Sequence, residues 1–238
     1  MIIYGLNPVL EALRSHPERV HFVAVARGAH TQRAFDAAKK AGVPVRILPP
    51  EQIDRLAGGG VHNGVVADLS QAAFADFDEV VAREATGFVM ILDGITDPQN
   101  FGAILRVADG FGVDLVVIPQ HESVGLTPAA VKASAGASEW VPVAQVRNVA
   151  RAIETLAKGG YWIYAAAGGG DTPASIDFRG KVALVLGSEG KGIRRNVLEH
   201  CDRTVSIPMA GRISSFNVAT AAAVLCYEVR RQQQQSGK

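Results

Sequence analysis

Three segments of the sequence place polar side chains or glycines directly after an apolar stretch. In the first, residues 93–112, carboxylates and Asn100 cluster at a predicted helix start, and Arg106 lies among apolar neighbours. Open α/β sheets bind ligands beyond the carboxyl ends of their strands, so this segment is a candidate ligand site. Two structural interpretations stay open: Arg106 can extend from an apolar face into water, and Asn100 can make a local cap or turn hydrogen bond.

The second segment, residues 184–195, follows a predicted buried strand with Gly187, Gly190 and Gly192. Glycines let a backbone approach a ligand closely and leave its amides free to bind it. Their spacing matches neither G-x-G-x-x-G nor G-x-x-x-x-G-K-[ST], so the common nucleotide-binding patterns are excluded. A turn with glycines in the left-handed conformation explains the segment equally well.

The third segment, residues 205–228, contains Ile-Pro-Met, a polar crossing, and then Ser215 and Asn217 at the start of a helix. This helix is apolar nearly all round, which predicts that it is buried on several sides. A second subunit could cover one of those sides, and core packing within one chain is the alternative.

The elements that must position these residues fall into two groups. In residues 1–69, four apolar runs predict strands at 2–4, 20–26, 43–48 and 61–69. Two further patterns predict helices: one is capped by Asn7 with Pro8 following it, and the other covers residues 31–41. This is a small α/β domain. Residues 70–84 have no strong period and are predicted to be a linker with at most a short helix.

From residue 85 the pattern is a longer alternation of strands and helices, with predicted strands at 88–92, 115–118, 141–143, 161–166, 181–186 and 204–207. Helix starts are predicted at Asp97-Pro98, at Thr127-Pro128 and near Asn148, and Ser214 or Ser215 is expected to cap a last helix ending near Arg231. We therefore predict a second domain over residues 85–232, a mostly parallel sheet covered by helices. Residues 233–238 are expected to be a disordered tail.

Composition sets further limits. The 238 residues contain 48% hydrophobic residues, 24 Lys and Arg against 23 Asp and Glu, and two isolated cysteines, Cys201 and Cys226. No apolar run approaches the roughly 18 residues of a membrane span, and the cysteines suit neither a disulfide framework nor a zinc site. The net charge is +3 over residues 1–67, −4 over 68–84 and +2 over 85–238, which permits a nucleic-acid partner. We predict a soluble, cytoplasmic protein with no membrane partner.

Taken together and in order, the three segments resemble the signature motifs of the SpoU branch of the SPOUT RNA methyltransferases. The first motif is matched by NFGAILR at 100–106, the second by LGSEGKG at 186–192, and the third by IPM at 207–209 with SFNV at 215–218. Phe216 stands where the family usually has leucine. The front domain, with Tyr4-Gly5 and the run HNGVVA at 62–67, is similar to the family's RNA-binding extension, which resembles ribosomal protein L30.

The resemblance implies a fold, a cofactor and a reaction. The second domain would contain a deep trefoil knot, and S-adenosylmethionine would transfer its methyl group to a ribose 2′-hydroxyl and leave as S-adenosylhomocysteine. No metal is expected, because a sulfonium needs none to release its methyl group. The closest subgroup methylates a guanosine in the peptidyl-transferase region of large-subunit (23S) ribosomal RNA. The cofactor-binding residues would be Gly187, Ile207 and Phe216, with Leu186, Met209 and Gly192 beside them.

The resemblance also implies a catalytic set: Arg106, Asn100, Glu189, Ser215 and Asn217. A guanidinium stays protonated, so the role predicted for Arg106 is to bind the substrate phosphate and stabilise the developing alkoxide. The phosphate or a second group would then take the proton. The other four would position Arg106, the ribose and the loops, with a purely structural role, receiving loop amides, as the alternative for Glu189. The apolar last helix predicts a homodimer.

Competing functions differ in what they leave unexplained. A nucleotide-dependent oxidoreductase lacks its G-x-G-x-x-G after an early strand. A non-catalytic RNA-binding module would leave the combination of Asn100, Arg106, Glu189 and Asn217 without a purpose. A transfer RNA 2′-O-ribose methyltransferase shares all three motifs and is the main alternative. The motifs also leave open whether free ribosomal RNA or an assembly precursor is the substrate.

Overall fold

The computed structural model describes residues 1–85 and 87–235, which form two units. The first contains Met1–Ala73 and Leu126–Trp140, and the second contains Phe74–Gly125 and the chain from Val141 onward. The sequence predicted residues 126–140 to belong to the second domain, whereas in the structure they group with the first unit. Helix α6 (Pro128–Ala133) puts Val131 into the core of the first unit, and buried Glu139 pairs with Arg19 at 3.0 Å.

The first unit is built on a four-stranded sheet in the order β1-β4-β2-β3, with β4 antiparallel to β1 and β2, and β2 parallel to β3. Its strands are β1 (Ile2–Tyr4), β2 (Val20–Val25), β3 (Val45–Ile47) and β4 (Val65–Leu69). Its first three helices are α1 (Leu6–Ser15), α2 (Gln32–Lys40) and α3 (Pro50–Ala57). Four strands and two helices were predicted here; α3 was not.

The start of α1 differs from the prediction. The cap position is Gly5, not Asn7, and no side chain caps the helix. Gly5 adopts a φ of 98° and donates its backbone N–H to the Val65 carbonyl at 2.9 Å. The positive φ favours glycine at this strand-to-helix junction, so the helix begins two residues before the proline expected to open it.

The second unit is a six-stranded, all-parallel sheet in the order β10-β8-β9-β5-β6-β7. The strands are β5 (Phe88–Asp93), β6 (Leu115–Pro119), β7 (Val143–Val146), β8 (Trp162–Asp171), β9 (Val182–Gly187) and β10 (Arg203–Val205). The fold class is therefore confirmed: a small mixed-sheet domain and a parallel-sheet domain. The trefoil knot stays a prediction, because strand order and register do not record how loops are threaded.

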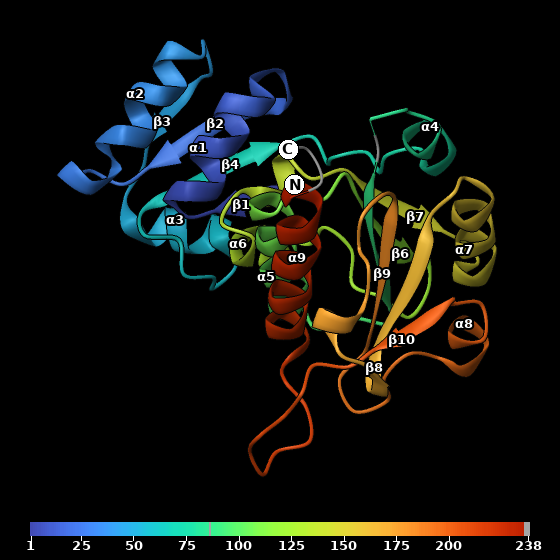
Figure 1. The fold of residues 1–238 in the computed structure, drawn as a ribbon. Coiled ribbons are helices and arrows are strands. Elements are labelled where there is room, and N and C mark those ends of the chain that lie inside the picture. The colour runs from blue at the N-terminus through green and yellow to red at the C-terminus, as the bar shows by residue number, and fades with distance from the viewer. Residues whose placement is uncertain (86, 236–238) are drawn as a thin grey trace. The chain divides into compact units, whose positions relative to one another are not determined.

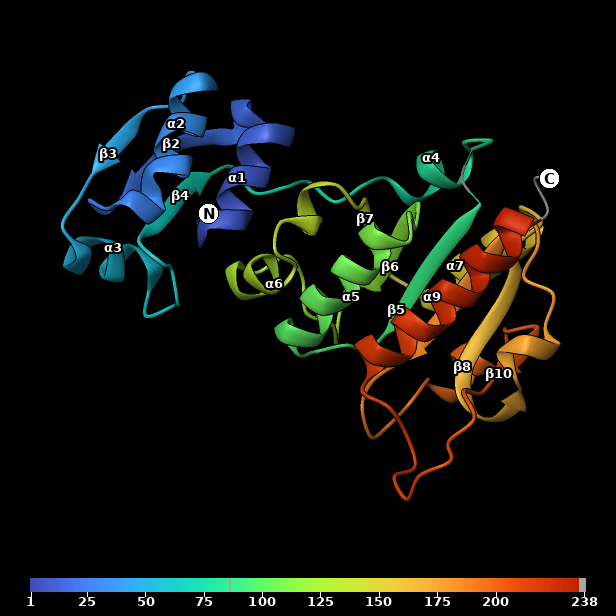
Figure 2. The same ribbon diagram turned by 60° about the vertical axis from the view of Figure 1, so that its left-hand side comes forward.

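Helices cover both faces of this parallel sheet (Figure 1). Helices α5 (Pro98–Gly110) and α9 (Val218–Gln235) lie side by side on one face, as both views show (Figures 1 and 2). Helices α7 (Val149–Lys158) and α8 (Arg195–Leu198) pack on the other face, and the short α4 (Phe77–Val81) lies near β7. Both faces of the central strands are consequently buried, as their continuous apolar sequences predict.

The end of α9 corrects the predicted disordered tail. Gln232 donates to the Ile176 carbonyl at 3.0 Å and accepts from the Phe178 N–H at 2.9 Å, and Gln233 donates to the Gly180 carbonyl at 3.0 Å. These bonds hold the glutamines in a helix that continues to Gln235. Residues 236–238, the rest of the predicted tail, lie outside the described part of the chain. Among the described helices, none combines the length and apolarity that crossing a membrane requires.

Candidate active site

A pocket of about 700 Å³ opens at the carboxyl ends of β9 and β10 and beside the middle of β8, within the second unit. This volume falls in the range of small-molecule sites. Its walls come from four places: residues 166–168 at β8, the glycine-rich turn after β9, the chain between β10 and α9, and one side of α9. The six residues predicted to bind a cofactor all line it: Leu186, Gly187, Gly192, Ile207, Met209 and Phe216.

The glycine-rich turn, residues 187–194, is closed by its own backbone. Ser188 and Gly192 exchange two N–H to carbonyl hydrogen bonds, at 3.1 and 2.9 Å. Gly190 and Gly192 have φ angles of 81° and 69°, and a Cβ on Gly187 would lie 2.2 Å from the carbonyl carbon of Gly192. The turn itself thus requires glycine at all three positions. We call residues 187–194 the glycine loop.

Asp93 fixes the end of the glycine loop. This carboxylate, 1% exposed at the end of β5, accepts the Arg194 backbone N–H and Nε, each at 2.8 Å, and Nη2 at 2.6 Å. Its position in the sheet is opposite Gly187, the other end of the loop. A buried carboxylate needs such charged partners, because burial without them is strongly unfavourable. Sequence reasoning missed this pair; the signal was an aspartate ending an otherwise fully apolar strand.

The opposite wall is a very different segment, residues 207–216, which we call the crossing loop. Within the described part of the chain, none of its backbone or side-chain groups has a hydrogen-bond partner. Most of it is exposed, including Ile213, and Phe216 is 40% exposed although it lines the pocket. The loop therefore presents apolar side chains and unbonded peptide groups to whatever enters the pocket.

Asn217 caps α9, which corrects the predicted cap at Ser214 or Ser215. Its Oδ1 accepts from the backbone N–H of Ala219 at 2.9 Å and of Thr220 at 3.4 Å. Ser215 lines the pocket without a hydrogen bond to any described residue. The helix starts later than predicted because the amide side chain of Asn217 reaches the free N–H groups of the first turn.

The same Asn217 joins the three segments singled out by sequence. Its Nδ2 donates to Asn100 Oδ1 at 2.8 Å and to Glu189 Oε1 at 2.7 Å. Since Oδ1 is held by backbone N–H groups, the amide cannot turn over without breaking the network. Asn100 is thus not a local cap, a role that Asp97 fills for α5 through the Gln99 N–H. Glu189 accepts from a side chain and, among the described residues, from no loop amide.

Arg106 is not part of this network. It is exposed on α5, does not line the pocket, and has no hydrogen bond or ion pair with a described residue. Six residues on a helix amount to about 9 Å of rise and a rotation of roughly 240°, so Arg106 and Asn100 face different directions. Helical geometry thus separates the two ends of the first motif within one chain.

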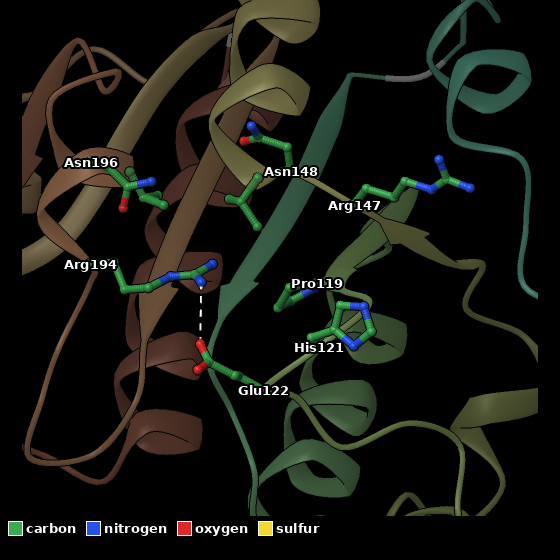
Figure 3. A pocket seen from close by; sticks show the side chains of 9 residues that line it. Pro119, His121, Glu122, Arg147, Asn148, Arg194 and Asn196 are labelled. Carbon is green, nitrogen blue, oxygen red and sulfur yellow. Dashed lines mark hydrogen bonds and ion pairs between the residues drawn. The ribbon is translucent and has the colours of Figure 1, made fainter.

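A second, smaller hollow of about 240 Å³ lies beyond the ends of β6 and β7 (Figure 3). Arg194 crosses it to Glu122, whose carboxylate lies 3.5 Å from Nη1. His121 and Arg147 also line it, have no polar partner among the described residues, and were not predicted. Arg147 points away from Arg194 in Figure 3. Arg194 is neutralised by its carboxylate partners, so Arg147 is the lining guanidinium with no ion pair among the described residues.

The cysteines offer no reactive thiolate. Cys201 and Cys226 are free, as the sequence predicted, and burial is the main cause that raises the pKa of each thiol to about 12. In the described part of the chain, no group of three or more His, Cys, Asp or Glu side chains is placed to hold a metal ion. The amide–carboxylate network of Asn217, Asn100 and Glu189 lies at the 700 Å³ pocket.

An all-parallel sheet whose strand ends carry this pocket and the three motifs defines an RNA 2′-O-methyltransferase of the SPOUT class. Residues 87–227 match the model of the SpoU rRNA Methylase family, and residues 2–75 match the model for RNA 2′-O ribose methyltransferase substrate binding. The chain belongs to the SpoU rRNA methylase family.

Individual relatives agree over nearly the whole chain. The 23S rRNA (guanosine-2′-O-)-methyltransferase RlmB of Shewanella oneidensis is 39% identical, covering 97% of each chain. The putative TrmH family tRNA/rRNA methyltransferase YacO of Bacillus subtilis is 37% identical, covering 99% of this chain and 97% of that one. The SpoU methyltransferase AviRb of Streptomyces viridochromogenes, solved in complex with AdoMet, is 26% identical, with a TM-score of 0.84 over all of this chain and 91% of that one. The enzyme class predicted from the motifs is confirmed.

Proposed function

We propose that this protein transfers a methyl group from S-adenosylmethionine to the 2′-hydroxyl of a guanosine in 23S ribosomal RNA. The observation that carries the proposal is the meeting of all three motifs at Asn217, on the rim of one pocket. The relatives named RlmB, which this chain matches over nearly its full length, supply the choice of RNA and nucleoside.

The pocket suits this cofactor. Leu186, Ile207, Met209 and Phe216 provide apolar surface, the crossing loop provides unbonded peptide groups, and Glu189 is the only charged side chain among the described residues that line it. An adenine ring needs donors and acceptors at its edge and apolar contact on its faces, which these walls offer. When bound, S-adenosylmethionine supplies an electrophilic methyl group on a sulfonium.

The chain's own residues orient the substrate rather than act as metal or thiol catalysts. Asn217, held by Asn100 and Glu189, fixes the junction of the three segments, and Ser215 lies beside it at the pocket wall. The Arg106 guanidinium binds the substrate phosphate, where its charge also stabilises the developing alkoxide. The phosphate or a second group accepts the proton.

We infer a homodimer formed through α9. Val224 and Tyr227 are exposed on this helix, Tyr227 to 58%, and α5 with Arg106 packs beside it. Arg106 is turned away from the pocket of its own chain, so in the dimer it serves the pocket of the second protomer. Light scattering at micromolar concentration checks this: a dimer that Tyr227→Glu converts to monomer supports it, and a wild-type monomer contradicts it.

The function is tested with labelled S-adenosylmethionine and unmodified RNA. Label in 23S ribosomal RNA that resists alkaline cleavage at one guanosine is the expected result. Label only in transfer RNA would show that transfer RNA, the main alternative, is the substrate. The relative YacO is described as a tRNA/rRNA methyltransferase, which is why this alternative is tested. If free 23S RNA is not labelled, ribosome assembly precursors are the next substrate, and failure there too contradicts the proposal. The proposal also includes a cytoplasmic location for the protein.

Arg106→Ala tests the catalytic assignment. We expect methyl transfer to fall by at least about 100-fold, the usual effect of removing one positioned charge in a transition state. Cofactor affinity, measured by calorimetry, should stay within a few-fold. Arg195→Ala is a matched control, because Arg195 is exposed and its side chain pairs with Glu199 and with no other described residue. A parallel loss of cofactor binding in Arg106→Ala would contradict the substrate-side role.

A further inference from the structure

The first unit contains a hollow of its own, of about 500 Å³, between α2 and the ends of β2 and β3. Helix α2 and strand β3 lie together at the edge of this unit (Figures 1 and 2). The hollow is lined by the apolar residues Val25, Ala26, Phe35 and Ile47 and by the polar residues Arg27, Thr31 and Gln32. None of these residues belongs to the motifs of the methyl-transfer site.

The apolar part of the hollow is built by strand register. Val25 and Ile47 are paired at the carboxyl ends of the parallel strands β2 and β3. Ile47 is 52% exposed there, and Phe35 of α2 packs only partly against the core. A large β-branched side chain left half in water at a strand end, next to an aromatic ring, provides apolar surface that the unit itself does not cover.

The wall formed by residues 26–31 is rigid. Thr31 is 2% exposed, and its hydroxyl oxygen lies 2.7 Å from the Ala26 carbonyl and 2.9 Å from the Gly28 carbonyl. The Ala26 N–H donates to the Gly64 carbonyl at 2.8 Å. Because these bonds hold the loop in place without a ligand, binding in the hollow does not require the loop to be ordered first.

One cation, Arg27, lines the hollow, and it belongs to a basic stretch of sequence. Residues 26–47 contain five Lys and Arg and one acid, Asp36, which is engaged by the Gln32 side chain at 2.8 Å. Arg27 and Arg33 have no hydrogen bond or ion pair with any described residue. The unpaired Arg27 guanidinium, which lines the hollow beside its apolar side chains, fits a ligand that combines a flat apolar body with negative charge.

We propose that this hollow binds one unpaired nucleobase of the RNA substrate, with Arg27 contacting an adjacent phosphate. Single-stranded RNA is bound in this way, by stacking bases on apolar and aromatic side chains and by Arg contacts to the backbone. The inference rests on the proposed function, since it assigns a contact to the same RNA substrate. It makes the hollow a subsite for a base that is not the methylated one.

The test compares full-length variants for binding a mixed-sequence single-stranded RNA of about 12 nucleotides and its duplex, by fluorescence anisotropy. Ile47→Ser should weaken single-strand binding by about 5- to 10-fold, within the range for loss of base stacking. Ile47→Phe, which keeps a large apolar side chain at this position, should bind single-stranded RNA as tightly as wild type or more tightly. Arg27→Ala should weaken both RNAs and lower the salt slope by about one.

Two controls separate the hollow from general effects. Val61→Ser removes another exposed apolar side chain of the same unit, and Arg14→Ala removes a cation at the far end of α1, paired there with Glu11. Both should bind RNA like wild type. With 23S ribosomal RNA as methyl acceptor, Ile47→Ser should raise KM by a factor similar to its loss of binding and leave kcat and cofactor affinity unchanged.

Three results would overturn the inference. Ile47→Ser could bind single-stranded RNA like Val61→Ser, or the substitution could weaken duplex and single strand equally, which would indicate a backbone contact without a base. Ile47→Ser could also dissociate an oligomer in light scattering, which would make the hollow a contact between copies of the chain. Absence of methyl transfer by the wild-type protein would instead contradict the proposed function, while the binding comparison still tests the hollow.

Discussion

The two loops that face each other across the 700 Å³ pocket are built in opposite ways. The glycine loop is closed by two backbone hydrogen bonds and tied to β5 through the Asp93–Arg194 pair. The crossing loop, in contrast, has no hydrogen bond to any described residue over ten positions. One wall of the site is therefore formed in advance, and the other wall is left for a ligand to order.

The difference has a thermodynamic consequence for binding. Fixing a backbone residue opposes association by about 1–2 kcal/mol, so ordering even part of the crossing loop consumes a substantial share of the contact energy. The glycine loop avoids this loss because folding has already fixed it. We therefore expect the glycine loop to determine where the ligand binds, and the ordering of the crossing loop to determine how readily the ligand is released.

The largest expected effect comes from breaking the formed wall. Asp93→Ala removes the carboxylate that accepts three donors of Arg194. Removing one partner of a buried pair destabilises by about 3–5 kcal/mol, and because Arg194 can reach water we expect about 2–3 kcal/mol, measured by urea unfolding. Cofactor affinity should fall at least about tenfold, since the loop that lines the pocket loses its anchor.

Glu122→Ala is the matched control for that clamp. It removes the outer carboxylate, which lies 3.5 Å from Arg194 at the surface, and exposed pairs of this kind contribute less than about 1 kcal/mol. If Asp93→Ala unfolds at the same urea concentration as Glu122→Ala, Asp93 does not hold the glycine loop.

A smaller effect is expected in the crossing loop, where the rate of amide hydrogen exchange is measured with and without S-adenosylmethionine. We expect saturating cofactor to slow exchange in the crossing loop by at least about tenfold, equivalent to about 1.4 kcal/mol. Exchange in the glycine loop should change by less, because its amides at Ser188 and Gly192 are already bonded. Equal protection of both loops would remove the distinction between them.

The same contrast explains how far sequence reasoning reached. Local signals were sufficient where neighbouring residues decide the structure: Asp97, Thr127 and Asn148 cap their helices as predicted. The signals for α3, Pro50 at its first turn and Gly58 in the left-handed conformation after it, are also local and were overlooked. All six predicted cofactor residues and three of the five predicted catalytic residues line one pocket.

Contacts between distant residues could not be predicted from local pattern. Asn217 and Asn100 are 117 positions apart, and Asp93 and Arg194 are 101 apart. The same limit applies to residues 126–140, which meet the first unit through Val131 in its core and through the pairing of Glu139 with Arg19, 120 positions away. Arg106 shows a further limit, since a motif that is continuous in sequence points its two ends in different directions on a helix.

The smallest effect concerns the far end of α9, the helix that begins where the crossing loop ends. Hydrogen bonds from Arg231 lower the pKa of the Glu228 carboxyl below its ordinary value, partial burial opposes this, and Gln232 lowers it further. A carboxyl with a lowered folded-state pKa stabilises the protein above its unfolded-state pKa, and this contribution is lost as pH falls through the folded-state pKa. The C-terminal end of α9 should therefore weaken in acid, between those two pKa values.

Glu228→Gln isolates this contribution, because glutamine is a neutral substitute for the protonated acid. At neutral pH the wild type should exceed the variant in free energy of unfolding by less than about 1 kcal/mol, as solvent screens a pair near the surface. The difference should shrink as pH falls below the ordinary glutamate range. If the difference in free energy of unfolding between wild type and Glu228→Gln instead grows in acid, the predicted direction is wrong. The ion pair of Glu228 with Arg231 would then not stabilise the end of α9, in contrast to the pair that anchors the glycine loop.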